Sequence, residues 1–216
     1  PGPVGSQHQI GIIGRGSGLS ASHTINGHSV AFRLRYGNVR FLFTGDLNQE
    51  AGERLRKALP NASLRCEILK APHHGSADFD MEFLKEAGPV VSLISSGDES
   101  AQKEYIHPRA TLMSALGKAS RTTPGVIFCT ELAAFFSYMG RIAVPIPDKP
   151  GQTRMVDSFE RTNFGIIHVR TDGERVLAFT HSGREGMNEA YRFTVSPNGE
   201  VTFADEASKI SAPKAA

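Results

Sequence analysis

Two apolar segments that each end in metal-binding residue types constrain the fold of this chain most. One runs through Cys66, Ile68 and Leu69 into Lys70-Ala71-Pro72-His73-His74-Gly75-Ser76, and the other is Arg40-Phe41-Leu42-Phe43-Thr44-Gly45-Asp46. Such runs predict strands, and the glycines allow sharp turns beside the polar residues. The pattern therefore predicts two strands that bring a carboxylate and an imidazole to one rim of a sheet.

Composition indicates a soluble globular chain with a hydrophobic core. It has 216 residues, of which 39% are hydrophobic and 21% are charged, and its net charge is +2. That charge is too small to support nucleic-acid binding by electrostatics alone. No apolar run approaches the ~20 residues of a membrane span, and no signal peptide or other indication of a compartment is present. Cys66 and Cys129 form no CxxC pair, so we expect buried thiols.

Hydrophobic periodicity predicts alternating strands and helices over the first 130 residues. A helix is expected over residues 47–59, where Leu47, Ala51, Leu55 and Leu59 recur every four positions. Further helices are expected at 80–87 and after His107-Pro108. The expected strands are 28–35, 39–43, 64–70, 90–94 and 125–130.

The remaining sequence predicts a long excursion followed by β-structure. Residues 140–162 are polar and rich in proline, which indicates a lid-like loop. Thr171-Asp172-Gly173-Glu174 predicts one hairpin between strands 164–170 and 175–180. Pro197-Asn198-Gly199-Glu200 predicts another between strands 191–196 and 201–204. We expect residues 1–27 to be a flexible or partly ordered lead-in and residues 206–216 to be a frayed tail.

Asp46, His73 and His74 each have a structural interpretation beside the chemical one. Asp46-Leu47-Asn48-Gln49 matches a D-x-x-Q capping box, so Asp46 could cap the following helix. The two histidines could belong to a solvated polar turn. Alternatively, Asp46 has the chemistry of a carboxylate that bridges two metal ions, and His74, or its neighbour His73, has that of a terminal ligand.

His107 also has two interpretations. It precedes Pro108, and proline favours the first position of a helix, so His107 could be a surface residue beside a cap. Alternatively, it lies at the rim of a site, where it binds a substrate oxygen or transfers a proton. His168 and His181 have the character of structural residues.

The ordered set Thr44-Gly45-Asp46, then Leu69 to Ser76, then His107-Pro108 resembles the metallo-β-lactamase superfamily. The branch it resembles is the soluble hydrolase domain of bacterial DNA-uptake competence proteins, and the likeness covers residues 26–120. The resemblance implies a four-layer αβ/βα sandwich, an α/β fold, of which residues 28–205 would form mainly the C-terminal half with β-hairpins at their end.

The resemblance also implies a chemistry. Asp46 would be a bridging carboxylate, His74 a histidine ligand, and His73 and His107 catalytic residues. Two zinc ions, or manganese or iron, would supply a hydroxide that attacks an ester, phosphodiester or lactam-type bond.

The chain departs from the family in one respect, because it contains no H-x-H sequence, whereas the family uses an H-x-H-x-D-H cluster in its first half. We therefore expect the missing ligands to come from an upstream half of the fold, truncated or cleaved, or from a separate segment or second copy of the chain. The alternative is a non-catalytic half-domain that serves in binding or assembly. If the chain is part of an enzyme, the expected substrate is a small molecule or a phosphodiester.

Overall fold

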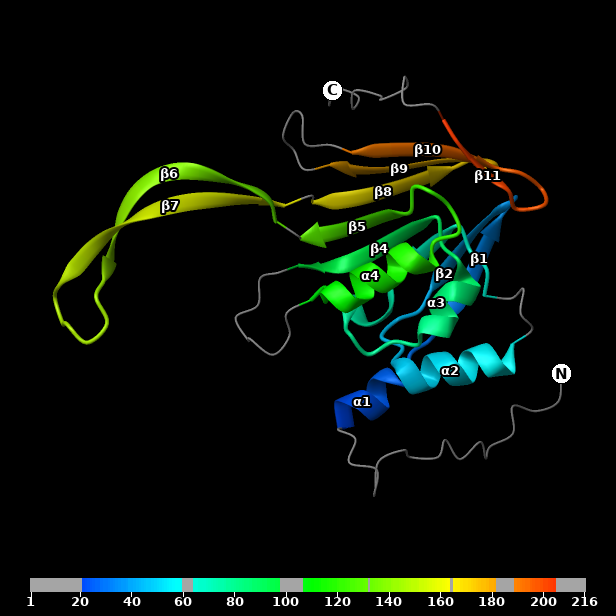
Figure 1. Ribbon diagram of the computed structural model, residues 1–216, viewed down its shortest axis with the longest axis horizontal. Coiled ribbons are helices and arrows are strands. Elements are labelled where there is room, and N and C mark those ends of the chain that lie inside the picture. The colour runs from blue at the N-terminus through cyan, green and yellow to red at the C-terminus, as the bar shows by residue number, and fades with distance from the viewer. Residues whose placement is uncertain are drawn as a thin grey trace.

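The computed structural model describes residues 21–59, 64–97, 107–131, 133–163, 165–181 and 189–204. Figure 1 shows a layer of helices, a five-stranded sheet and a four-stranded sheet stacked in that order, with a long two-stranded ribbon that extends away from them. The described residues thus form three layers and a projecting arm.

The central sheet has the strand order β1-β2-β3-β4-β5. β1 and β2 form an antiparallel hairpin, whereas β2, β3, β4 and β5 run parallel to one another. Their carboxyl ends therefore share one edge of the sheet, which is where ligands commonly bind in α/β sheets. The bounds are Phe32–Tyr36, Val39–Phe43, Ile68–Lys70, Val91–Gly97 and Val126–Glu131.

Three helices cover one face of this sheet: α2 (Gln49–Ala58), α3 (Met81–Ala87) and α4 (Ala110–Ala119). Leu84 of α3 and Leu116 of α4 pack with the sheet residues that point to this face, and they form a buried core. Asp80 caps α3 by accepting a hydrogen bond from the amide of Glu82, and Gly88 ends it in the left-handed region at φ 50°. The helix predicted over 80–87 is confirmed.

The second sheet packs on the opposite face, with strand order β11-β10-β9-β8. Its bounds are Val201–Phe203, Ala190–Val195, Arg175–His181 and Ile166–Thr171. Phe193 and Ala178 of this sheet and Val91 and Phe128 of the central sheet form the second core. Both hairpins predicted at the C-terminal side are confirmed by the antiparallel pairs β8–β9 and β10–β11.

The turns of two hairpins join the sheets. Gly37, at φ 58°, lies so close to Gly173 that an added Cβ would meet the Gly173 carbonyl oxygen at 2.5 Å. The amide of Asn38 donates to that carbonyl at 2.6 Å. Only glycine fits both the conformation and the close approach here.

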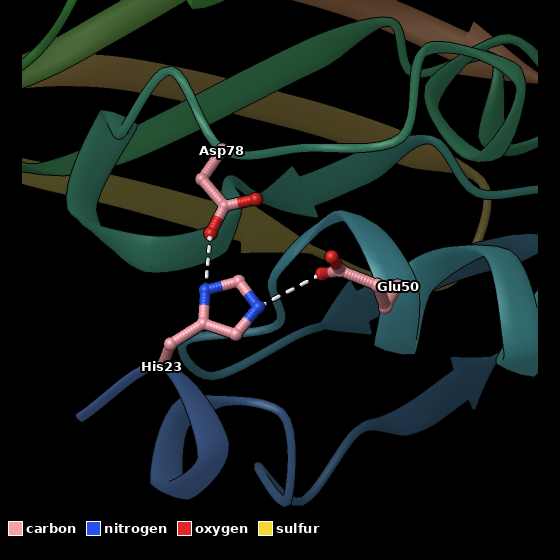
Figure 2. A group of neighbouring side chains, drawn as sticks. All are labelled: His23, Glu50 and Asp78. Atoms are coloured by element: carbon pink, nitrogen blue, oxygen red, sulfur yellow. Dashed lines mark hydrogen bonds and ion pairs between the residues drawn. The ribbon is translucent and has the colours of Figure 1, made fainter. Parts of the chain in front are cut away.

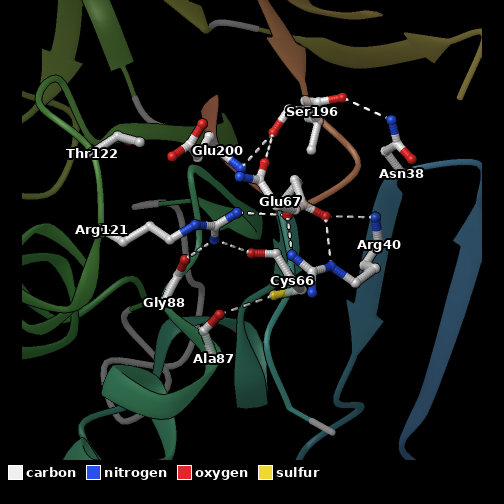
Figure 3. A network of polar contacts seen from close by, with 12 residues as sticks. Asn38, Arg40, Cys66, Glu67, Ala87, Gly88, Arg121, Thr122, Ser196 and Glu200 are labelled. Carbon is white, nitrogen blue, oxygen red and sulfur yellow. Dashed lines mark hydrogen bonds and ion pairs between the residues drawn. The ribbon is translucent and has the colours of Figure 1, made fainter. Parts of the chain in front are cut away.

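A buried ion-pair network lies at the amino end of β3, away from the carboxyl edge (Figure 3). Glu67 is fully buried, and its Oε1 accepts hydrogen bonds from Arg40 at 2.6 Å and Arg121 at 2.5 Å. Arg121 also donates to the carbonyls of Cys66 and Gly88, so it links the sheet to the chain that follows α3. Burial raises the pKa of the neighbouring Cys66 thiol to about 12. Cys66 and Cys129 are both buried and form no disulfide, as predicted.

The arm consists of β6 (Ala133–Pro145) and β7 (Thr153–Asn163), which pair antiparallel with each other. It replaces the lid-like loop predicted over 140–162, and that prediction is wrong in secondary structure. The prolines that suggested a loop lie at the tip of the ribbon and at the end of β6, where a strand tolerates them.

The predicted four-layer αβ/βα sandwich is wrong. Within the described ranges the second sheet is antiparallel and made of hairpins, and no helix covers its outer face. The physical reason is that β8 and β9, and likewise β10 and β11, are joined by short turns at 172–174 and 196–200, which are too short to form a helical crossover. Residues 1–20 of the predicted lead-in and the whole predicted tail, 206–216, lie outside the described residues, and residues 21–26 form the short helix α1 (Ala21–Asn26).

Among the described residues no helix combines the length and apolarity needed to cross a bilayer.

Candidate functional site

The candidate site lies at the carboxyl edge of the central sheet. Asp46 follows β2 through Gly45, which has φ 53°, and its amide donates to Ser29 Oγ at 2.9 Å. Helix α2 begins only at Gln49, and its N-cap is Asn48, whose side chain accepts from the amide of Ala51. Asp46 is thus not the cap, so the capping-box interpretation is wrong and its carboxylate is available for other contacts.

His73 and His74 lie in a single turn, from Pro72 to Gly75, directly after β3. Both histidines have positive φ, 47° for His73 and 51° for His74. Residues other than glycine adopt this conformation at a cost and persist in it only where the surroundings impose it. The turn is held by the amide of His73, which donates to Gly45, and by Gly75, which accepts from the amide of Arg109. Such a held strained pair favours a functional interpretation over a solvated turn.

The imidazole of His74 is oriented toward Asp46. Its Nδ1 donates to the carbonyl oxygen of Ser95 at 2.7 Å, because a carbonyl can only accept. In the neutral ring the lone pair is therefore on Nε2, which lies 3.4 Å from Asp46 Oδ1. Two acceptors face each other across this gap, which a proton or a cation would bridge. The predicted convergence of Asp46 and His74 is confirmed, whereas their metal role stays a prediction.

His73 is held by the segment that precedes β1. The side-chain amide of Asn26, at the end of α1, lies 2.9 Å from His73 Nε2. Nδ1 of His73 is buried and has no hydrogen-bond partner among the described residues. The ring of His107 lies beside it, with centroids 6.0 Å apart. His73 and His107 thus lie side by side, and the role of His107 at the rim of a site stays a prediction.

His73 and His107 line an open hollow together with Asp78 and Arg109. Helix α4 begins at Ala110 with Arg109 as its N-cap, so Pro108 does not occupy the first helical position and the cap interpretation of His107 is not supported. The hollow combines two imidazoles, a guanidinium and a carboxylate, which can bind and polarise a polar group.

Lys70 lies on the other side of the His74 turn. Its Nζ donates to the Gly45 carbonyl at 3.2 Å, and the side chain lines a second hollow with Ser95, Glu131 and Ile166. Burial lowers the pKa of Lys70, and the negative charge of Asp46 partly opposes that effect. The ammonium group of Lys70 thus lies near the carboxylate of Asp46.

A second polar cluster lies where α1 meets α2 (Figure 2). His23 Nε2 is 2.9 Å from Glu50 Oε2, and His23 Nδ1 is 3.2 Å from Asp78 Oδ2. These three side chains are close enough to hold a metal ion. The two ring nitrogens, however, point to different carboxylates, and one ion cannot bind both nitrogens of one imidazole. The arrangement is better suited to an ion-paired imidazole that fixes α1 than to a chelate.

Sequence reasoning missed the residues that support the site. Asn26, Ser29 and Ser95 contribute through hydrogen bonds from distant segments. His23 had no ligand spacing, because its two carboxylate partners lie 27 and 55 positions further along the chain. The only available signal was local, namely the asparagine and serine that flank the glycine turn at residues 26–29.

Comparison with known proteins gives one limited similarity. The chain is 28% identical over 96 residues to ComE operon protein 3 of Bacillus subtilis (strain 168). The alignment covers 44% of this chain and 12% of that protein, so the chain spans a small part of the relative it matches. No family model matches the chain, and no solved structure matches it. The similarity therefore supports a relation to a competence-operon protein and no finer assignment.

Proposed function

We propose that this chain is part of a metal-dependent hydrolase of the metallo-β-lactamase type. The observation that carries the proposal is the gap between His74 Nε2 and Asp46 Oδ1, with the ring fixed by Ser95. Histidines that bind metals almost always donate their other ring N–H to an oxygen, as His74 does. The similarity to the competence-operon protein is consistent with the family likeness of the motifs.

The donor atoms fit a divalent cation in chemistry and spacing. Two ligand atoms on a tetrahedral zinc, with bonds of about 2.0–2.1 Å, lie about 3.3–3.4 Å apart. The separation of 3.4 Å between Asp46 Oδ1 and His74 Nε2 matches that value. Zinc sites generally use three or four protein ligands, however, and these two residues supply two. The complete site, for one zinc or two, with manganese or iron as alternatives, would thus take ligands from outside the described residues.

Each residue of the chain would have a distinct role in such a site. Asp46 and His74 would hold the cation, which when bound polarises the scissile bond and makes water nucleophilic at neutral pH. His107 and His73, in the adjoining hollow, would bind a substrate oxygen or transfer a proton to the leaving group. The bond would be an ester, a phosphodiester or a lactam-type bond. The net charge of +2 gives no support to a nucleic-acid substrate.

The shortage of ligands favours a second candidate, a non-catalytic module used in binding or assembly. In that case Asp46 and His74 would be a surface ion pair with no preference for a metal. The two candidates differ in whether this pair binds a cation.

Metal titration distinguishes them. We expect the purified chain to bind one zinc or cobalt(II) ion weakly, in isothermal titration calorimetry and in the visible spectrum of cobalt, and to lose binding with Asp46→Asn or His74→Gln. Asp148→Asn, in the tip of the arm, is the matched control and should retain binding. His23→Gln tests the second cluster and should also leave binding unchanged.

Absence of binding in the unmodified chain, or loss of binding only with His23→Gln, would contradict the assignment of Asp46 and His74. Activity is better tested on the longer protein, where the remaining ligands would be present.

A further inference from the structure

The β6–β7 arm exposes apolar side chains at a distance from both cores. Ile142 and Met155 are each 50% exposed and Met139 is 62% exposed. In the described part of the chain β6 and β7 pair only with each other, and Figure 1 shows them projecting beyond the end of β5. A two-stranded ribbon alone is marginally stable in water, and three or more strands are needed for independent stability. The arm therefore requires additional strands or another covering surface.

The two edges of the arm differ. Both irregularities of the pairing place an extra residue in β6, Ala134 and Met139, and β6 ends at Pro145. Bulges and prolines are the features that prevent an edge from pairing with another strand. From Thr153 to Ser158, β7 pairs without a bulge and contains neither proline nor glycine. The edge of β7 is thus the one open to a further strand.

We propose that two copies of the chain associate through β7, which pairs antiparallel with β7 of the second copy about a two-fold axis at Val156. This register makes a four-stranded sheet of order β6-β7-β7-β6. Because Ile142 lies opposite Val156 within each arm, one face carries a continuous row of Ile142, Val156, Val156 and Ile142. Rows of β-branched side chains on adjacent strands stabilise such a sheet.

The charges on β7 are compatible with this pairing. In the proposed register Arg154 lies opposite Ser158 of the second copy, and Met155 lies opposite Asp157. Asp157 is already paired with Arg141 of its own arm, at 3.6 Å. No like charges face each other directly, so the self-pairing meets the requirement that the same surface on both copies be complementary to itself.

Another edge strand that exposes large apolar side chains, β1, fails the same requirement. In β1, Phe32, Leu34 and Tyr36 are more than half exposed, at 54%, 51% and 56%. A two-fold pairing centred on Leu34 would place Arg33 opposite Arg35 twice, and like charges directly opposite each other destabilise a sheet. A second copy is therefore the occupant that fits β7 and does not fit β1.

The association would also affect the candidate site. The arm leaves the body where β5 ends and returns where β8 begins, and Glu131 and Ile166 at these points line the hollow beside Lys70. Two joined arms would fix the rim of that hollow in both copies. The inference itself rests on the arm alone and is independent of the proposed hydrolase function.

Substitutions at two positions test the register by charge exchange. Ser158→Arg places an arginine opposite Arg154 of the second copy at two equivalent points. Within its own arm the new side chain lies opposite Gly140, which has no side chain to crowd it. We expect the unmodified chain to sediment as a dimer, Ser158→Arg as a monomer, and the double variant Arg154→Glu, Ser158→Arg again as a dimer.

Ala143→Arg is the matched control, because it adds the same charge to the protected strand of the arm and should leave the dimer intact. Circular dichroism checks that every variant is folded. A monomer for the unmodified chain at all concentrations, or a dimer that survives Ser158→Arg, would overturn the proposal. Failure of the double variant to restore the dimer would exclude the register.

Discussion

At the scale of single residues, the amino end of β3 holds an ion-pair network around a fully buried carboxylate. Glu67 has no solvent exposure, whereas Arg40 and Arg121 retain 19% and 17%. A buried carboxylate is tolerated only because both guanidinium groups and the amide of Arg40 donate to it. Its hydrogen bond raises the pKa of Arg40, while burial lowers that of Arg121.

Replacing Glu67 by Gln should therefore be costly. Removal of one partner of a buried ion pair costs roughly 3–5 kcal/mol, because the remaining charges stay buried without compensation. We expect a loss of this order in urea denaturation. Glu53→Gln, which breaks the exposed pair with Lys57, should leave the free energy of unfolding nearly unchanged, because solvent screens that pair. Equal effects of the two substitutions would contradict the structural importance of the network.

Cys66 makes stability depend on pH in the alkaline range. Burial, followed by the charge of Glu67, raises the pKa of its thiol from 9.0 to about 12 in the folded chain. Between these pH values the unfolded chain loses the thiol proton and the folded chain keeps it, so the free energy of unfolding should fall as pH rises. Denaturation midpoints measured from pH 8 to 11 should fall less steeply in Cys66→Ala. An unchanged slope would show that the thiol does not contribute.

At the scale of elements, the start of α2 decides what Asp46 can do. Asn48 accepts from the amide of Ala51 and donates to the carbonyl of His23, so it caps α2 and fixes α1 at once. Asp46 lies two residues before the cap, where it contributes nothing to the helix. The carboxylate that the sequence places in a capping box is thereby left facing His74.

Substitutions of Asn48 and of Asp46 should differ in their effect on the free energy of unfolding. Asn48→Ala removes the cap and should lower the free energy of unfolding by about 1 kcal/mol, within the usual range of 0.5–2 kcal/mol. Asp46→Ala should stay within about 0.5 kcal/mol of the unmodified chain, as most surface substitutions do. Chemical denaturation measures both. A larger loss for Asp46→Ala than for Asn48→Ala would restore the capping-box interpretation.

At the scale of the whole molecule, the central sheet is shared by two cores. Its side chains alternate between the helices on one face and the second sheet on the other. Unfolding of either layer would therefore expose buried residues of the central strands. The turn contact of Gly37 with Gly173 adds a further link between the sheets. These shared strands favour unfolding as a single cooperative unit.

Shortening a side chain in the second core should therefore destabilise both the helical layer and the second sheet. Phe193→Ala removes a fully buried side chain and should cost about 3–5 kcal/mol. Native-state hydrogen exchange should show the same loss of protection for the most stable amides of β9 and of α4. Loss confined to the second sheet would show that the layers unfold separately.

Much of the described fold could be predicted because its signals are local. The hairpin turns at 171–174 and 197–200 specify pairs of neighbouring strands, and the capped helix at 81–87 is defined by Asp80 and Gly88. Leu59, in contrast, recurs with Leu47, Ala51 and Leu55 in the helix predicted over 47–59, a periodicity that indicates a buried stripe, but it is 37% exposed. The helix ends at Ala58, and periodicity alone does not reveal where a stripe leaves the core.

By itself the sequence determined that a carboxylate and an imidazole follow two apolar strands, because strand and turn formation depend on residues adjacent in the chain. Only the tertiary structure decided that these strands are parallel neighbours and that Ser95 turns His74 toward Asp46. It also decided that the late hairpins form an antiparallel second sheet instead of part of a four-layer αβ/βα sandwich. These outcomes depend on contacts between residues that are distant in sequence, and neither periodicity nor turn chemistry encodes such contacts.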